Sequence, residues 1–228
     1  MKLNIKELLS YFDLRESTSN GDTTATIAVV GEDLGAGLFK HYCEYERRSS
    51  VKIFDAIPTT MQRVGRQLDR WILEKIGNKE ILYQAEIKNW CARAIGGIDI
   101  PLVVPDKTLA ALAKRNWDRD TNKITSREAN GLNKVFINMT NDTLLNIQNS
   151  YQKEPLLIFW EARNPKKHLG YFYKYKLPKK TFYYDYCWVF SCSLYLRNLY
   201  KNGERKVSIE MPNAGRRLKE LNRLFKVK

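Results

Sequence analysis

A carboxylate and an ammonium group lie two residues apart in a stretch that is otherwise mostly apolar. Residues 81–90 have the sequence ILYQAEIKNW, and the isoleucines and aromatic residues predict a buried strand. Side chains alternate along a strand, so Glu86 and Lys88 project from one face, and Gln84 shares that face. Because buried charged groups cost desolvation energy, chemistry is one reason to keep them there.

A second carboxylate, Asp69, is predicted to face Glu86 across a hairpin. Residues 67–73 (QLDRWIL) are a second candidate strand, and Gly77-Asn78 between the two strands is a hairpin signal. A turn centred on these two residues places Asp69 directly opposite Glu86, with Lys88 one diagonal step away. A slip of one residue in the register would turn Asp69 to the other face.

Two facing carboxylates and a nearby lysine predict metal-dependent hydrolysis of a phosphodiester. The carboxylates repel unless a cation lies between them or one of them is protonated. Hard divalent ions such as Mg²⁺ use such oxygen pairs, with phosphate oxygens completing the shell. A lysine can lower the pKa of an attacking water or stabilise developing negative charge. The structural alternative is a cross-strand salt bridge at a sheet edge, which contributes little to stability.

Asp69 followed by Glu86-Ile87-Lys88 on the next strand resembles the PD-(D/E)xK motif of the restriction-endonuclease-like nucleases. The resemblance covers roughly the first two-thirds of the chain, and Leu68 stands where the family usually has proline. It implies Mg²⁺, with Mn²⁺ as a substitute, held by Asp69, Glu86 and the Ile87 carbonyl, while Lys88 orients or activates water. Gln84 resembles a position that is often polar in these sites.

The resemblance also implies an acidic residue on an upstream helix, and Glu32 matches that place. Asp33 is the neighbouring candidate. We predict a helix over about 31–47, so Glu32 lies in its first turn, where the helix dipole alone favours a carboxylate. Asp55, in a predicted strand over 51–57, is the rival of Asp69 as the metal-binding aspartate.

The positive charge of the chain predicts a polyanionic partner. The net charge of +14 is spread through the sequence, which favours nucleic acid through counterion release, and the resemblance favours DNA over RNA. Arg63, Arg66 and Arg70 lie beside the predicted site, and we expect them either to contact phosphates or to be solvated. Residues 165–186 interleave lysines, which suit phosphates, with aromatic rings, which suit stacking. The alternative is a β-hairpin with buried rings and a solvated lysine face. The candidate lysines are Lys174, Lys176, Lys179 and Lys180.

The remaining patterns predict a single α/β domain with a mixed central sheet flanked by helices. In the restriction-endonuclease-like reading, the core covers about 25–165 and a basic, aromatic-rich elaboration covers about 166–228. We expect a helix within 2–12, a central strand at 155–160 and a closing helix over 214–225. The leucines of that closing helix are predicted to face inward. Further predictions are helices at 107–116 and after 125, and strands at 134–138, 189–200 and 206–210.

Other features narrow the classes of function. No apolar run approaches the roughly 20 residues of a membrane span, and the first residues lack a signal-peptide block, so we expect a cytoplasmic protein without membrane contact. The four cysteines predict buried free thiols, and two distant histidines give poor support to a Ser-His-Asp hydrolase.

The resulting expectation is a DNA endonuclease, by analogy in bacterial defence or repair. The alternatives are a non-catalytic nucleic-acid-binding module and a structural subunit of a larger defence complex. A homodimer stays open.

Overall fold

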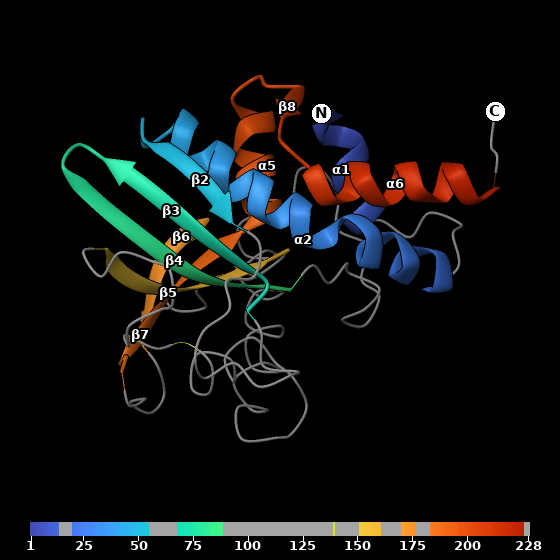
Figure 1. The fold of residues 1–228 in the computed structure, drawn as a ribbon. Helices are drawn as coiled ribbons and strands as arrows, with labels where there is room; N and C mark the ends of the chain where they lie inside the picture. The colour runs from blue at the N-terminus through green and yellow to red at the C-terminus, as the bar shows by residue number, and fades with distance from the viewer. Residues whose placement is uncertain are drawn as a thin grey trace.

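The computed structural model describes residues 1–13, 20–54, 68–88, 139, 151–160, 170–176 and 183–225. Over these residues the protein is α/β, with a six-stranded mixed sheet flanked by helices (Figure 1). The elements in chain order are β1 (Lys2–Asn4), α1 (Ile5–Asp13), α2 (Asn20–Tyr45), β2 (Ser50–Phe54), β3 (Arg70–Ile76), β4 (Lys79–Lys88), β5 (Gln152–Phe159), β6 (Phe172–Lys176), β7 (Tyr186–Ser191), α5 (Cys192–Lys201), β8 (Lys206–Ser208) and α6 (Pro212–Phe225).

The sheet has the strand order β2-β3-β4-β5-β7-β6, and β1 pairs with β8 in a separate two-stranded sheet. The β2–β3 and β3–β4 pairs are antiparallel, the β4–β5 and β5–β7 pairs are parallel, and the β7–β6 pair is antiparallel. Parallel strands are normally buried on both faces, which explains the continuous apolar run of β5. The prediction of a central strand at 155–160 is confirmed, and the segment after 165 extends the same sheet.

The hairpin between β3 and β4 has the predicted register. Gly77 in the turn has a φ of 56°, a left-handed conformation that glycine adopts without strain. The pairing runs from Ile76 opposite Lys79 to Arg70 opposite Ala85. The first strand begins at Arg70, later than predicted, so Asp69 immediately precedes it.

The two faces of the sheet bury different sets of side chains. On the helix face, Tyr83 and Ala85 of β4 pack in one cluster with residues of α1, α2 and α5. On the opposite face, which we call the Glu86 face, Leu82 of β4 packs with Trp71, Leu157 and other apolar residues. Because side chains alternate along β4, Gln84 and Glu86 belong to the Glu86 face.

Helix α2 begins eleven residues before the predicted start, so that prediction is wrong. It runs from Asn20 to Tyr45 and includes the β-branched stretch 26–30. β-Branched residues lower helix propensity by only a fraction of a kcal/mol each, so such a stretch does not by itself prevent a helix. Glu32 therefore lies in the middle of a helix, and the first-turn explanation for its charge fails.

The predicted strand at 189–200 is also wrong. Residues 189–191 are the end of β7, and Cys192–Lys201 form the helix α5. Most side chains of α5 are buried, and a short, mostly apolar run does not distinguish a buried helix from a strand. The strand predicted at 206–210 exists as β8, but it pairs with β1 and not with 189–200.

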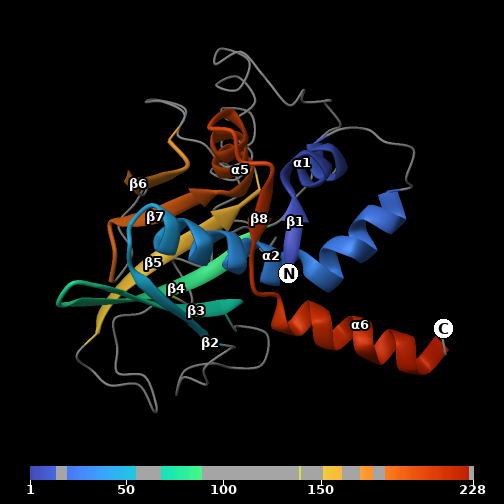
Figure 2. The same cartoon turned by 90° about the horizontal axis from the view of Figure 1, so that it is seen from above.

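The closing helix is confirmed as α6, but its leucines do not face inward as predicted. Leu218, Leu221 and Leu224 are 42%, 40% and 68% exposed. Helix α6 extends away from the sheet (Figure 2), and the hydrogen bonds to its first turn hold it to α2.

Two smaller expectations can be compared with the structure. The thiols of Cys43, Cys187 and Cys192 are free and buried, as predicted. Among the described helices, none combines the length and apolarity that crossing a bilayer requires.

Candidate metal and nucleic-acid site

Asp69 reaches across the hairpin to the strand that carries Glu86 and Lys88. Its Oδ2 accepts a hydrogen bond of 2.7 Å from the backbone N–H of Ile87. This bond fixes the aspartate against the Glu86-Ile87-Lys88 segment, just beyond the last pair of the ladder, Arg70 opposite Ala85. The structure thus brings together the two segments that the sequence predicted to meet.

Glu86 and Gln84 are deeply buried on the same face of β4. Glu86 is 1% exposed and Gln84 is 0% exposed. The Gln84 Nε2 donates to the Tyr184 hydroxyl at 2.9 Å. Tyr184 was missed by the sequence reasoning, because it lies 100 residues further along the chain and no local pattern marks it. This hydrogen bond fixes the orientation of the Gln84 side chain on the Glu86 face.

The donor atoms at this place match the preference of Mg²⁺ in kind. Mg²⁺ takes oxygen ligands and is usually bound through one or two carboxylates together with waters and substrate phosphates. Asp69, Glu86 and the Ile87 carbonyl supply such oxygens. No group of three or more His, Cys, Asp or Glu side chains that could hold a metal occurs within the described residues. A site here would therefore depend on two carboxylates and non-side-chain oxygens.

Comparisons of this chain with protein-family models, with curated proteins and with solved structures found no match. The case for the site therefore depends on the geometry of its own residues.

Arg70 projects to the helix face and forms ion pairs inside the protein, so it is not the solvated side chain of the alternative, and phosphate contact by Arg70 stays a prediction. Its side chain is 8% exposed and its guanidinium donates to Glu32 at 2.9 Å and to Asp33 at 3.0 Å. It also donates to the backbone carbonyl of Asp69 at 2.6 Å. Arg70 is thus a buried cation that connects the helix carrying Glu32 to the residue that begins the hairpin site.

Of the two acidic candidates on α2, Glu32 is the more accessible and Asp33 the more constrained. The side chain of Glu32 is 41% exposed, whereas that of Asp33 is 3% exposed. Asp33 accepts from the backbone N–H of Ala214 at 2.7 Å and from the Asn213 side chain at 3.2 Å. Asp33 therefore caps the first turn of α6 by accepting an N–H that has no partner within the helix, so its charge has a structural role.

Two of the predicted nucleic-acid lysines lie on the helix face and not on the Glu86 face. In the sheet register Lys174 pairs with Trp188, Trp188 with Leu156, and Leu156 with Ala85, so Lys174 shares the face of Ala85. Lys176 follows by alternation. Both lysines are exposed and lie on the face of the sheet opposite Glu86. The predicted hairpin, in which lysines alternate with aromatic rings, is present.

The Lys174 ammonium rests on an aromatic platform. Its Nζ lies 3.4 Å from the centroid of the Tyr186 ring, a cation–π contact. Burial, followed by a 2.6 Å hydrogen bond to Glu154, raises the pKa of the Tyr186 hydroxyl, so this ring stays neutral and donates. The platform fixes the position of one lysine without neutralising its charge.

Several predicted residues lie outside the described residues. These are Asp55, Arg63, Arg66, Lys179, Lys180 and the side chain of Lys88, together with the predicted helices at 107–116 and after 125 and the strand at 134–138.

Proposed function

We propose that this chain is a Mg²⁺-dependent nuclease of the restriction-endonuclease-like type, acting on phosphodiester bonds of DNA. The observation that supports the proposal is the hydrogen bond from the Ile87 N–H to the Asp69 carboxylate, which holds Asp69 against the residue that follows Glu86 on β4. The order of strands supports it further: an antiparallel β2-β3-β4 unit carries Glu86 on β4 and follows Asp69 into β3, and the parallel strand β5 lies next to it. The net charge of +14 suits the polyanionic substrate.

Each residue has a separate role in this proposal. Asp69, Glu86 and the Ile87 carbonyl hold the cation, and Lys88 orients or activates the attacking water. Bound Mg²⁺ would supply Lewis-acid stabilisation of charge on the phosphate oxygens. Because Glu86 is 1% exposed, its charge acts in a poorly screened environment, where its attraction to a cation exceeds that of a surface carboxylate.

The test is cleavage of linear, circular and single-stranded DNA by the full chain, with and without Mg²⁺. Lys88→Ala should reduce cleavage by at least about a hundredfold, the usual contribution of a proton-transfer group, while DNA and metal binding persist. Lys75→Ala is the matched control, because Lys75 lies in the same hairpin and its side chain is 59% exposed. Full activity of the Lys88→Ala variant would contradict the assignment.

A second candidate is a non-catalytic nucleic-acid-binding module of the same fold. The observation that favours it is that both acidic candidates on α2, Glu32 and Asp33, pair with Arg70, so each has a structural use. The same assay separates the two functions. DNA binding without cleavage in either Mg²⁺ or Mn²⁺ would identify the chain as a non-catalytic nucleic-acid-binding module.

A further inference from the structure

Asp69 lies just beyond the paired part of the hairpin, and two hydrogen bonds hold it there. The β3–β4 ladder ends with Arg70 opposite Ala85, so Asp69 lies outside the paired residues of β3. Its carboxylate accepts from the Ile87 N–H at 2.7 Å, and its backbone carbonyl accepts from the Arg70 Nη1 at 2.6 Å. The conformation of Asp69 therefore depends on Arg70 as well as on β4.

The position of Arg70 is in turn set by two carboxylates on α2. Its Nη1 donates to Glu32 Oε2 at 2.9 Å, and its Nη2 donates to Asp33 Oδ1 at 3.0 Å. The Arg70 side chain is 8% exposed, so water screens these charge-assisted bonds weakly. Because Nη1 contacts both the Glu32 carboxylate and the Asp69 carbonyl, these two residues lie next to each other. One guanidinium thus joins α2 to the start of the hairpin.

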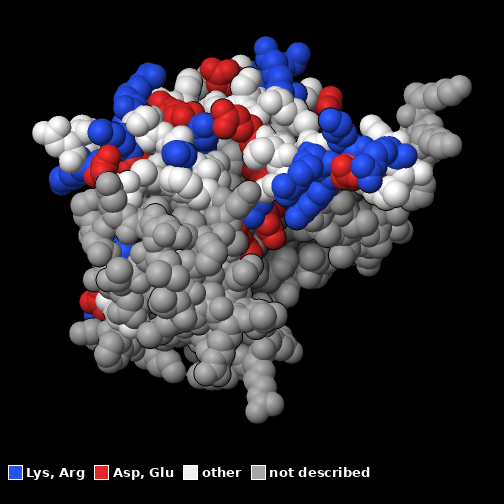
Figure 3. Space-filling view, viewed as in Figure 1, with Lys and Arg blue, Asp and Glu red and all other residues white. Residues whose placement is uncertain are grey.

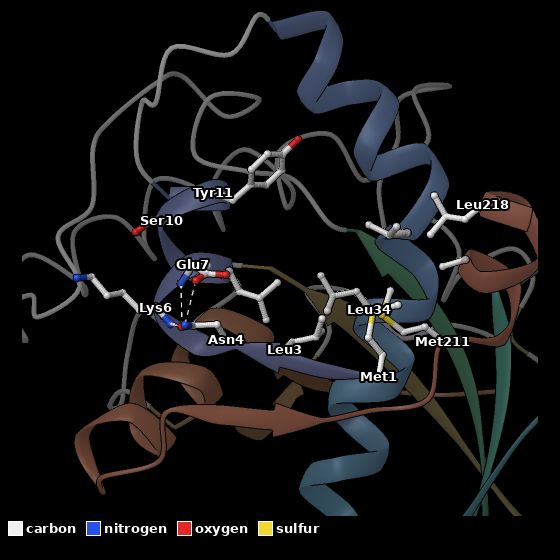
Figure 4. Close-up of a pocket in the computed structure, with 13 residues that line it drawn as sticks. Met1, Leu3, Asn4, Lys6, Glu7, Ser10, Tyr11, Leu34, Met211 and Leu218 are labelled. Carbon is white, nitrogen blue, oxygen red and sulfur yellow. Dashed lines mark hydrogen bonds between the residues drawn. The ribbon is translucent and has the colours of Figure 1, made fainter. Parts of the chain in front are cut away.

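The carboxylate of Asp33 is itself held where α2 meets α6. It accepts from the Asn213 amide and the Ala214 N–H, both at the start of α6. Beside this polar contact, Leu34 of α2 and Leu218 of α6 line one apolar pocket (Figure 4), and Leu34 is 1% exposed. Two helices therefore support the side chain of Arg70 from the helix face of the sheet.

The bond from Arg70 to the Asp69 carbonyl goes beyond what a structural ion pair needs. Glu32 and Asp33 already supply negative charge to the guanidinium. A third acceptor on the backbone of Asp69 connects this buried pair to a candidate metal ligand. The flat, two-nitrogen fork of arginine suits such a bridge, because it donates in fixed directions to several acceptors at once.

We infer that Arg70 is a positioning residue that orients Asp69 toward the cation. By holding the carbonyl of Asp69, Arg70 restricts the backbone there and keeps the carboxylate against β4 before a metal binds. The ligand is then ordered on folding and not on metal binding, which raises the affinity for the metal. The inference rests on the proposed function, because it takes Asp69 as a metal ligand.

The test measures Mn²⁺ binding to the full chain, through the loss of the electron paramagnetic resonance signal of free Mn²⁺. Arg70→Met removes the guanidinium and should weaken Mn²⁺ binding about 10- to 100-fold, the usual effect of losing a group that holds a metal ligand. Arg70→Lys keeps the charge but offers one nitrogen in place of two, so its loss should be smaller. If Arg70→Met does not fold, Arg70→Lys alone decides the comparison with the parent.

Hydrogen exchange in the metal-free protein tests the positioning of Asp69 without reference to any metal. The Ile87 amide donates to the Asp69 carboxylate, so its exchange reports whether that carboxylate is held in place. In Arg70→Met this amide should exchange about tenfold faster than in the parent, beyond any change shared by the rest of β4.

Two control variants separate positioning from stability and from net charge. Leu199→Ala removes a buried side chain of α5, so it destabilises the fold without removing any hydrogen bond of Asp69 or Arg70. Lys219→Met removes one exposed positive charge from α6, over which Lys and Arg side chains gather (Figure 3). Both controls should bind Mn²⁺ as the parent does.

The outcomes distinguish failure of this inference from failure of the proposed function. If the parent binds Mn²⁺ and cleaves DNA, but both Arg70 variants bind Mn²⁺ as the parent does, only the inference is overturned. An equal loss of Mn²⁺ affinity in Leu199→Ala and Arg70→Met would also overturn it, because stability alone would then explain the loss. Weaker metal-free DNA binding by Arg70→Met, with unchanged Mn²⁺ affinity, would assign Arg70 to phosphate contact instead. Mn²⁺ binding that is absent in the parent, or unchanged in Asp69→Asn, would overturn the proposed function and with it the role of Arg70 toward a metal.

Discussion

Replacing Asp33 should loosen helix α6 from the rest of the protein. Asp33→Ala removes a carboxylate that accepts the Ala214 N–H and the Asn213 amide and pairs with Arg70. Loss of a helix N-terminal cap costs about 1 kcal/mol. Removing one partner of a buried ion pair costs about 3–5 kcal/mol, but Arg70 keeps Glu32 and the Asp69 carbonyl, so we take about half of that, roughly 2 kcal/mol.

The total of about 3 kcal/mol corresponds to a fall in melting temperature of roughly 6–12 °C for a chain of this size. Asp33→Asn should cost less, because asparagine still accepts the Ala214 N–H but lacks the charge that pairs with Arg70. The matched control is Glu32→Ala, which removes a neighbouring carboxylate that also contacts Arg70 but is 41% exposed. It should cost less than about 1 kcal/mol.

The assay is urea unfolding of the parent and the three variants, combined with hydrogen exchange at the Ala214 amide. Asp33→Ala should release the protection of that amide, whereas Glu32→Ala should retain it. Equal destabilisation by the two alanine variants, with unchanged exchange at Ala214, would refute the claim that Asp33 holds the start of α6.

Three further predictions follow from the described contacts. Mg²⁺ should stabilise the parent by about 1.4 kcal/mol at roughly 10 times its Kd, and Asp69→Asn should lose this gain in a thermal melt; equal stabilisation of both forms would argue against a metal role for Asp69. Burial lowers the pKa of His41 below its ordinary value of 6.5, so the stability that neutral His41 contributes is present above that pH and is lost as pH falls through the folded-state pKa. Urea unfolding between about pH 6.5 and pH 5 should therefore show a smaller loss of stability in His41→Gln than in the parent. Replacing four lysines by alanine should make the salt dependence of DNA binding shallower, by roughly 1 in the slope of log K against log salt for each lost phosphate contact. An unchanged slope would show that these lysines only solvate the hairpin. The four are Lys174, Lys176, Lys179 and Lys180.

The parts of the fold that the sequence predicted are those that local signals determine. The turn at Gly77-Asn78 fixes the β3–β4 register, because a short hairpin leaves few alternative pairings, and from it the position of Asp69 follows. The apolar run at 155–159 predicted the central place of β5, because a strand that is covered on both faces has no side that must be polar.

The parts that the sequence did not predict depend on contacts between distant segments. Arg70 lies beside the candidate acidic residues in sequence, but its partners on α2 lie 37 and 38 residues earlier and turn it into a buried cation. The alternation around Lys174 was predicted, yet only the strand order shows that this lysine lies on the face opposite Glu86. Propensity also misplaced the start of α2, because β-branched residues disfavour a helix by only a fraction of a kcal/mol each and are a weak stop signal.

The pairing of β1 with β8 has a consequence for the order in which the molecule is assembled during synthesis. Lys2 pairs with Ser208, so β1 leaves the ribosome long before the strand with which it pairs. Closing so long a loop is entropically costly until the intervening sheet has formed. Met1 and Leu3 line an apolar pocket between α1, α2 and α6, so this pocket is completed only when β1 pairs with β8. A nascent chain in which β8 has not yet been made would therefore form the Asp69 hairpin before this pocket is complete.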